Sequence, residues 1–216
     1  MNEMEHAVHD EKLNPLSSIW TQPKKTICYV IKHKSISYVI LLLSICTIGS
    51  LCTGLIDSEL YPHIPIWGII ALLLILSPVV GILTNTIYAF VFMLFGKLFN
   101  GIATFTDLFK ALSLVYIPYV ILIPFYLIWM IVDSKSLFYP NFADSIAFPL
   151  FVLFLTFIVF IWSFVLSIIA VAVTHNISYW KAILSILIPS VLLSILMFII
   201  ILIFILIIII IGVSFS

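Results

Sequence analysis

The sequence contains no arginine and little charge of either sign. Its 216 residues carry nine basic side chains, all lysine, and nine acidic ones, so 8% of the chain is charged and the formal net charge is zero. A soluble domain carries about 25% charged residues, so this composition excludes a soluble protein. A neutral chain also lacks the basic surface that binds nucleic acid. We therefore expect no nucleic-acid partner.

Residues that carry chemistry are few and scattered. The three cysteines and five histidines form no metal-ligand spacing, and the chain has no nucleophile elbow, P-loop or zinc-helix motif. Cys46 and Cys52 are six positions apart in an apolar run, so on a helix they face different directions and a disulfide is not expected. The sequence predicts a protein that is not an enzyme and holds no metal or cofactor.

Apolar residues, in contrast, make up 64% of the chain, and the mean hydropathy is +1.36. Five runs without a charge each exceed the roughly 20 residues that cross a bilayer. They are residues 35–56, 66–95, 112–132, 146–174 and 183–213. A lone strand in lipid leaves its backbone unpaired, so even the isoleucine-rich last run is predicted to be helical. The predicted fold class is an all-α integral membrane protein with five transmembrane helices.

The second run is long enough to be one helix or two half-spans, with Pro78 and Gly81 near its middle. Two halves of about 15 residues would each be too short to cross. A single crossing places eight lysines on one side of the membrane and only Lys135 on the other. By the positive-inside rule, the N-terminus is then cytoplasmic and the C-terminus extracytoplasmic.

The N-terminal region indicates two further segments, a polar tail over residues 1–13 and a basic element over residues 14–34. Pro23 suits the first turn of a helix. Three apolar residues then fall on one helical face: Ile27, Val30 and Ile31. We expect an amphipathic helix in the headgroup region, anchored by Trp20 and Tyr29, or a basic flank that only orients the protein.

A short polar connection, residues 96–111, separates the second and third runs and is called the knee below. Gly96 and Gly101 are expected to break the preceding helix, because glycine adopts backbone conformations that other residues avoid. Thr106 and Asp107 are expected to cap a short helix that leads back into the membrane.

Small residues at every fourth position predict where helices pack, since lipid supplies no hydrophobic drive between them. They recur in the first and last runs: Cys46, Ser50 and Gly54, then Ser190 and Ser194. We interpret these positions as helix-packing contacts within one monomer, called the seam below. Contacts between the subunits of a homo-oligomer are the alternative.

Polar side chains within the runs are rare. Ser77, Thr84 and Asn85 lie near Pro78 in the second run. No charged residue or histidine lies at membrane depth, which argues against proton coupling. Asn85 is predicted either to line a site or to make an interhelical hydrogen bond.

Three stretches carry a family resemblance: NPLSSIWTQPKKTICYVI, then FGKLFNGIATFTDLFKAL with Tyr116-Ile117-Pro118 after it, then THNISYWKAILSILIP, which ends at Pro189. In this order they resemble the membrane domain of the YIP (Ypt-interacting protein) family. The resemblance spans residues 14–196 and implies a five-helix membrane domain, here residues 35–216. Bacterial members tend to have two adjacent glycines where this chain has Gly96-Lys97.

Eukaryotic members of that family lie in Golgi and ER membranes and bind small GTPases through a longer N-terminal region, whereas the short region here resembles the bacterial form. Some bacterial members accompany ABC-type efflux systems that protect against toxic peptides. The resemblance therefore implies a non-enzymatic adaptor of the bacterial plasma membrane that contacts lipids and a membrane protein such as an ABC transporter subunit. The candidate partner contacts are Trp20, Gly96, Gly101, Phe105, Asp107 and Trp180, and the candidate packing or pathway positions are Gly54, Pro78, Asn85, Pro118 and Pro189.

Two other functions stay open. One is a small-molecule or lipid transporter lined by Asn85, Thr84 and Ser77. The other is a membrane-shaping protein whose helix over residues 14–34 wedges into one leaflet.

Overall fold

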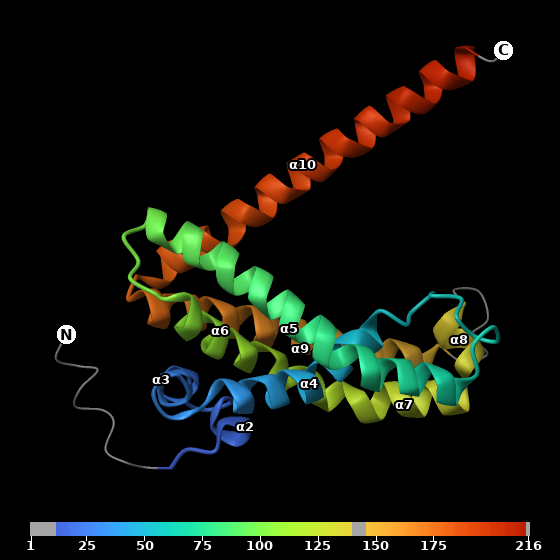
Figure 1. Cartoon of the computed structure of the whole chain (residues 1–216). Helices are drawn as coiled ribbons and strands as arrows, with labels where there is room; N and C mark the ends of the chain where they lie inside the picture. The colour runs from blue at the N-terminus through green and yellow to red at the C-terminus, as the bar shows by residue number, and fades with distance from the viewer. Residues whose placement is uncertain (1–11, 140–145, 215–216) are drawn as a thin grey trace.

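The computed structural model describes residues 12–139 and 146–214, and this part of the chain is all-helical (Figure 1). Its elements are α2 (Pro15–Ser18), α3 (Pro23–His33), α4 (Ile36–Thr53), α5 (Ile66–Leu98), α6 (Phe105–Ser113), the 3-10 helix η1 (Leu114–Ile121), α7 (Leu122–Val132), α8 (Ser134–Phe138), α9 (Ala147–His175) and α10 (Tyr179–Ser214). Five stretches are long and apolar enough to cross a membrane, with α6, η1 and α7 together forming the third. This confirms the predicted fold class, while most of the polar tail predicted for residues 1–13 lies outside the described residues.

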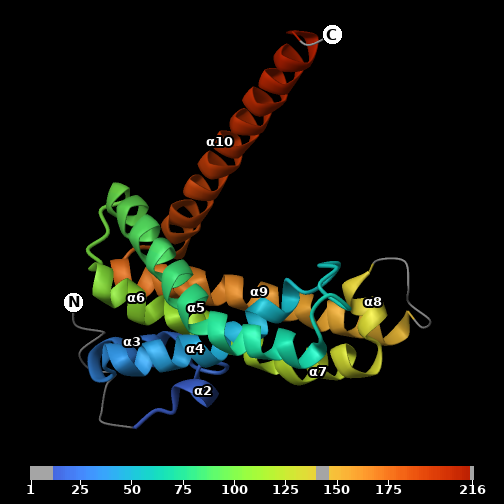
Figure 2. The ribbon, with the colours of Figure 1, turned by 45° about the vertical axis from the view of Figure 1, so that its right-hand side comes forward.

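The second span is one continuous helix, α5. Pro78 has no N–H to donate to the Leu74 carbonyl, and the Ser77 hydroxyl donates to that carbonyl instead, at 3.3 Å. A single crossing brings the knee to the same end of the bundle as α3 and the start of α10 (Figures 1 and 2). This end, called the lysine end, carries Lys24, Lys25, Lys32, Lys34, Lys97, Lys110 and Lys181, whereas Lys135 lies in α8 at the opposite end.

The side of the membrane that each end faces stays a prediction, which cysteine labelling in intact cells can test. Ile102→Cys at the lysine end, where the side chain is 72% exposed, should resist a membrane-impermeant maleimide, and exposed Lys135→Cys should react. The opposite pattern would invert the topology. Native thiols add little background, because Cys46 and Cys52 are buried in α4 and burial raises the pKa of Cys28, leaving little thiolate at neutral pH.

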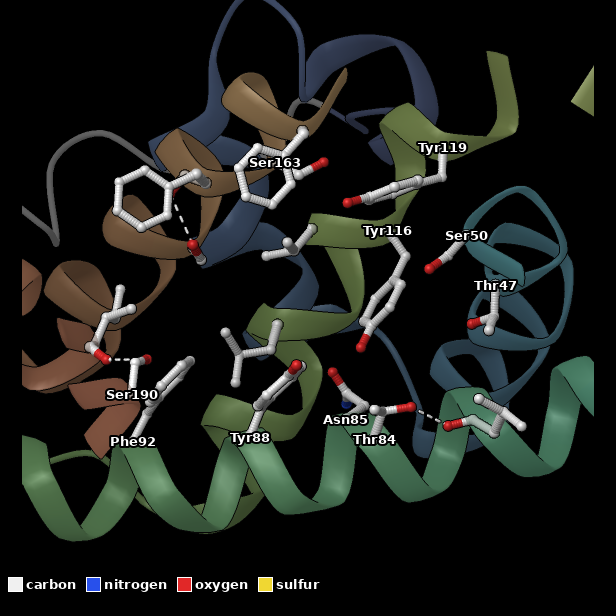
Figure 3. Close-up of a pocket in the computed structure, with 17 residues that line it drawn as sticks. Thr47, Ser50, Thr84, Asn85, Tyr88, Phe92, Tyr116, Tyr119, Ser163 and Ser190 are labelled. Carbon is white, nitrogen blue, oxygen red and sulfur yellow. Dashed lines mark hydrogen bonds between the residues drawn. The ribbon is translucent and has the colours of Figure 1, made fainter. Parts of the chain in front are cut away.

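The third span changes helix type in its middle. Pro118 lacks the N–H that would bond the Leu114 carbonyl in an α-helix, and residues 114–121 form the 3-10 helix η1. Side chains three positions apart eclipse in such a helix. Tyr116 and Tyr119 therefore project on the same side, into the bundle (Figure 3).

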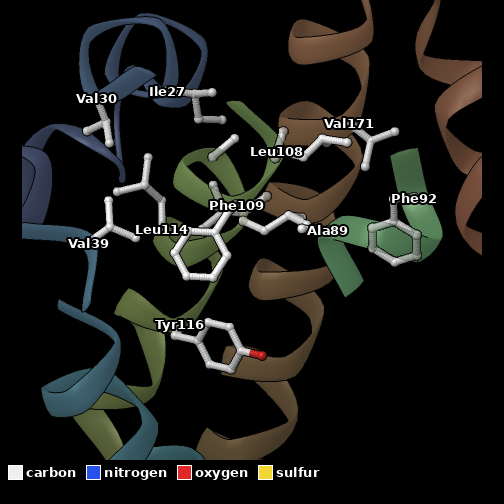
Figure 4. Packing of buried hydrophobic residues seen from close by; sticks show 14 of the residues in the cluster. Ile27, Val30, Val39, Ala89, Phe92, Leu108, Phe109, Leu114, Tyr116 and Val171 are labelled. Atoms are coloured by element: carbon white, nitrogen blue, oxygen red, sulfur yellow. The ribbon is translucent and has the colours of Figure 1, made fainter. Parts of the chain in front are cut away.

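Two buried hydrophobic clusters fill the bundle. The cluster nearer the lysine end gathers side chains of α3, α4, α5, α6 and α9 around Leu108 and Phe109 (Figure 4). The second cluster surrounds Tyr126 and Trp129 and reaches α8. At that end, the Trp129 indole N–H donates to the Ser136 hydroxyl at 2.8 Å, which ties α7 to α8.

The basic N-terminal element differs from its prediction. It consists of two helices, α2 and α3, with Pro23 at the start of α3 as expected. The apolar face of α3 is covered by protein rather than lipid, since Ile27 and Val30 are 1% and 0% exposed. The Lys110 ammonium also donates to the Ile31 carbonyl at 3.0 Å. The element is therefore docked on the bundle.

The predicted anchor Trp20 also contacts protein. Its ring lies parallel to that of Trp162, in the middle of α9, with 6.3 Å between the ring centroids. Tyr29 stacks on His33 within α3, at 4.8 Å. Half-exposed aromatic rings on this element thus have protein neighbours as well as solvent or lipid.

A close contact between α4 and η1 uses a glycine outside the predicted seam. Gly54 follows the last turn of α4 and is exposed, and a Cβ there would meet only the Leu51 carbonyl oxygen, at 3.4 Å. A Cβ on Gly49, in contrast, would overlap the backbone carbonyl of Tyr119. The seam prediction is therefore wrong at Gly54, and Gly49 is where α4 meets η1.

Candidate functional site

Two sites stand out, and the first is a clamp at the lysine end built on His175, whose side chain is completely buried. The Nε2 atom of its imidazole lies 3.0 Å from the Phe92 carbonyl oxygen. The Ala103 N–H donates to Nδ1 at 3.4 Å. Both ring nitrogens are satisfied when the proton is on Nε2. The Ile102 N–H also donates to the His175 carbonyl, at 3.1 Å, so the clamp joins α5, the knee and the end of α9.

Gly96 and Gly101 form two walls around this imidazole. A Cβ on either glycine would overlap the ring. The expectation that they break the helix is wrong, because Gly96 lies within α5 and neither glycine has a positive φ. The chain reverses instead at Asn100, with φ 64°, and α9 ends in the same way at Asn176, with φ 55°.

The helix of the knee, α6, begins at Phe105 and is capped by Thr104 rather than by Thr106, which lies inside it. The Thr104 hydroxyl oxygen accepts a hydrogen bond from the Asp107 N–H at 3.2 Å, and the hydroxyl donates to the Asp107 carboxylate at 2.6 Å. This reciprocal cap satisfies an otherwise free N–H of the first turn. Asp107, predicted as a partner contact, therefore has a structural role.

Apolar side chains are exposed around the clamp. They are Leu98 (72%), Ile102 (72%), Trp180 (69%), Tyr179 (53%) and Phe105 (37%), and we call them the knee surface. Phe105 and Trp180 are two of the predicted partner contacts. Gly96 is buried and Gly101 half-buried, so these two glycines lie beneath this surface, and their role in binding a partner stays a prediction.

The second site is a cavity of about 450 Å³ inside the bundle (Figure 3). It lies among α4, α5, α6, η1, α9 and the first turns of α10. Its polar lining consists of Thr47, Ser50, Thr84, Asn85, Tyr88, Tyr116, Tyr119, Ser163, Ser167 and Ser190. None of the lining residues is charged. Thr84 and Asn85, two of the three residues predicted to line a transport site, line this cavity, whereas the third, Ser77, does not.

Asn85 makes an interhelical hydrogen bond and also lines the cavity. Its Nδ2 donates to the Phe109 carbonyl at 2.8 Å, an interhelical bond between α5 and α6. Its Oδ1 is buried and has no hydrogen-bond partner among the described residues. The amide therefore fixes α6 with one end and presents an acceptor to the cavity with the other (Figure 3).

A comparison with family models decides the classification. The model of the Yip1 domain matches residues 17–202. The chain belongs to the Yip1 domain family. This confirms the resemblance to YIP proteins, a membrane-protein family not known for enzymatic activity. No curated protein and no solved structure matches the chain.

Both sites fall within the Yip1 domain, and α10 continues beyond it from residue 203. His175 was not among the predicted site residues, because the five histidines are scattered and form no metal-ligand spacing. A signal was present: this histidine directly follows the fourth apolar run, residues 146–174, and is the second residue of the third family-like stretch. Gly96 and Gly101, which pack against its ring, were predicted to matter for a different reason, namely that glycine allows unusual backbone angles.

Proposed function

We propose that this Yip1 domain is a non-enzymatic membrane adaptor that docks a membrane-protein partner on its knee surface. The His175 clamp carries the proposal, because it joins the knee and the turn between α9 and α10 into one preformed unit. A preformed surface loses little conformational freedom on binding. Clustered exposed apolar side chains are the usual composition of an interaction site.

The surroundings of the knee surface favour an integral membrane partner. Exposed Lys97 and Lys181 flank its apolar side chains, so a partner with acidic residues near the membrane interface would be complementary in charge. A subunit of an ABC transporter in the bacterial plasma membrane is the class of partner that we propose. We favour the adaptor over the membrane-shaping alternative, because Ile27 and Val30 on the apolar face of α3 are buried against protein.

Site-specific photo-crosslinking in cells can test this adaptor role. Benzoylphenylalanine at Ile102 should give a protein adduct of defined mass, and the adduct should disappear with Trp180→Ser. The matched control position is Ile75, which is 68% exposed in the first third of α5, far from the lysine end, and should give no such adduct. Adducts with lipid or with a second copy alone, at both positions, would contradict the proposal.

A further inference from the structure

We propose that the cavity binds an uncharged amphiphile from the bilayer, with a hydroxyl or carbonyl head group held inside and its hydrocarbon chain left among the lipids. A volume of about 450 Å³ lies within the range of small-molecule sites. This inference goes beyond the adaptor role and does not depend on it.

The cavity lies at the depth of the hydrocarbon core. Counted along the helices at about 1.5 Å per residue, Asn85 lies about 20 Å from the end of α5 at Leu98. Similar counts place Ser163 about 18 Å, and Thr47 about 16 Å, from the same end of the bundle. The hydrocarbon core is about 30 Å thick, so three helices independently place the polar lining near its middle.

Three buried polar atoms of the lining have no hydrogen-bond partner in the described part of the chain. They are Thr47 Oγ1, Asn85 Oδ1 and Ser163 Oγ, of which Ser163 Oγ lies near the Tyr119 hydroxyl but is not hydrogen-bonded to it. Figure 3 shows the side chains of Asn85 and Ser163 directed into the cavity. Unpaired polar groups are costly at membrane depth. A ligand that both donates and accepts hydrogen bonds would satisfy them, and Tyr116 and Tyr119 offer further hydroxyls beside them.

The lining also excludes charged ligands. It contains no lysine, histidine, aspartate or glutamate, and a phosphate or carboxylate would have no counter-charge there. Burying an unpaired charge costs far more than burying a hydroxyl. The head group is therefore neutral, which rules out phospholipid head groups and metal cations and favours hydroxyl or carbonyl groups.

The opening of the cavity faces sideways. On α4 and η1 the lining side chains are buried or half-buried, as are Thr47 and Tyr119. On the other side Tyr88 of α5 is 48% exposed, and Phe160 and Phe164 of α9 are 60% and 38% exposed. These aromatic residues lie in the middle of their helices, so the opening meets hydrocarbon. A ligand that reaches it needs an apolar part.

The last helix leaves this opening uncovered. Ile186 and Ser190 of α10 contribute to the lining, and Pro189 lies between them in the helix. Beyond Ser190 the helix projects away from the bundle (Figures 1 and 2), and the side chains described from Val191 to Ile205 are exposed. The side of the cavity next to α5 and α9 therefore stays accessible to lipids.

Photolabelling of the purified full chain in mild detergent tests the inference, with a monoacylglycerol that carries a diazirine in its acyl chain as the probe. Label should concentrate in peptides of α5 and α9 that line the cavity. Excess monoolein should remove it, whereas oleate, with its carboxylate, should not. Glycerol should not compete either, and competition by glycerol would assign the cavity to a water-soluble polyol and overturn the proposal.

Two variants probe the site without breaking the bond from Asn85 to Phe109. Ser163→Leu fills the cavity, and Tyr119→Phe removes one hydroxyl. We expect about tenfold less label for the first, equivalent to one decade in affinity, and a smaller loss for the second. Thr86→Val is the matched control, because its hydroxyl donates to the Ile82 carbonyl of its own helix and does not line the cavity. Equal labelling of wild type and Ser163→Leu would overturn the proposal.

Discussion

Replacing Gly49 with alanine should push α4 away from η1 and destabilise the fold by at least about 3 kcal/mol, the upper part of the range for overpacked cores. The added Cβ would overlap the backbone carbonyl of Tyr119. A side chain could rotate away from such a contact, but a carbonyl within a helix moves only with its helix. Because Tyr119 also lines the cavity, displacing η1 should disturb the cavity as well as the contact between α4 and η1.

The measurement is thermal unfolding in mild detergent, where about 3 kcal/mol corresponds to a fall of about 6–12 °C in Tm for a chain of this size. Gly54→Ala is the matched control, since its Cβ meets only the Leu51 carbonyl oxygen at 3.4 Å and it lies on the same helix end. Equal Tm values for the two variants would show that α4 and η1 do not approach as closely as described.

Replacing His175 with alanine should cost about 3–4 kcal/mol, because it empties a packed space and leaves two backbone groups without their partners. Those groups are the Phe92 carbonyl and the Ala103 N–H. Gly96→Ala should cost about 2 kcal/mol alone, since its Cβ would overlap the imidazole. Exposed His63→Ala should leave Tm unchanged.

The double variant makes this prediction specific to the clamp. Once the imidazole is gone, the space beside Gly96 can hold a methyl group, so Gly96→Ala should cost less than about 0.5 kcal/mol in the His175→Ala background. Residues in contact commonly show interaction energies of about 0.5–3 kcal/mol in such cycles. If the two losses in the free energy of unfolding simply add, Gly96 is required by the backbone of α5 and not by contact with the imidazole.

Much of the architecture follows from the sequence because the bilayer permits few solutions. A charge-free run of sufficient length must be a helix in lipid, and the distribution of lysines then favours a single crossing by α5 despite Pro78. The ends of the spans were predicted to within a few residues except at the third. There the helix begins at Phe105 rather than at residue 112, since the cap at Thr104 starts it inside the knee.

The details of the sites were less predictable, for a physical reason. Glycine has two uses, unusual backbone angles and close approach, and sequence alone does not distinguish them. Gly96 and Gly101 were assigned the first use and have the second, whereas Asn100 supplies the positive φ. The polar cavity depends on residues from all five spans and on the 3-10 geometry at Pro118, which aligns Tyr116 with Tyr119. Spacing within one run reveals none of this.

The clamp has a consequence for synthesis on the ribosome. The Ala103 N–H can form its hydrogen bond only after His175, which lies 72 positions later in the chain, has been synthesised. At about 5–20 residues per second, that interval is about 4–14 s. During that interval the second and third helices can already be inserted, but the knee between them lacks its contacts with His175. These contacts form only when the fourth helix has been synthesised. A nascent chain stalled before His175 would therefore show an open connection to proteases that survey unfinished membrane proteins.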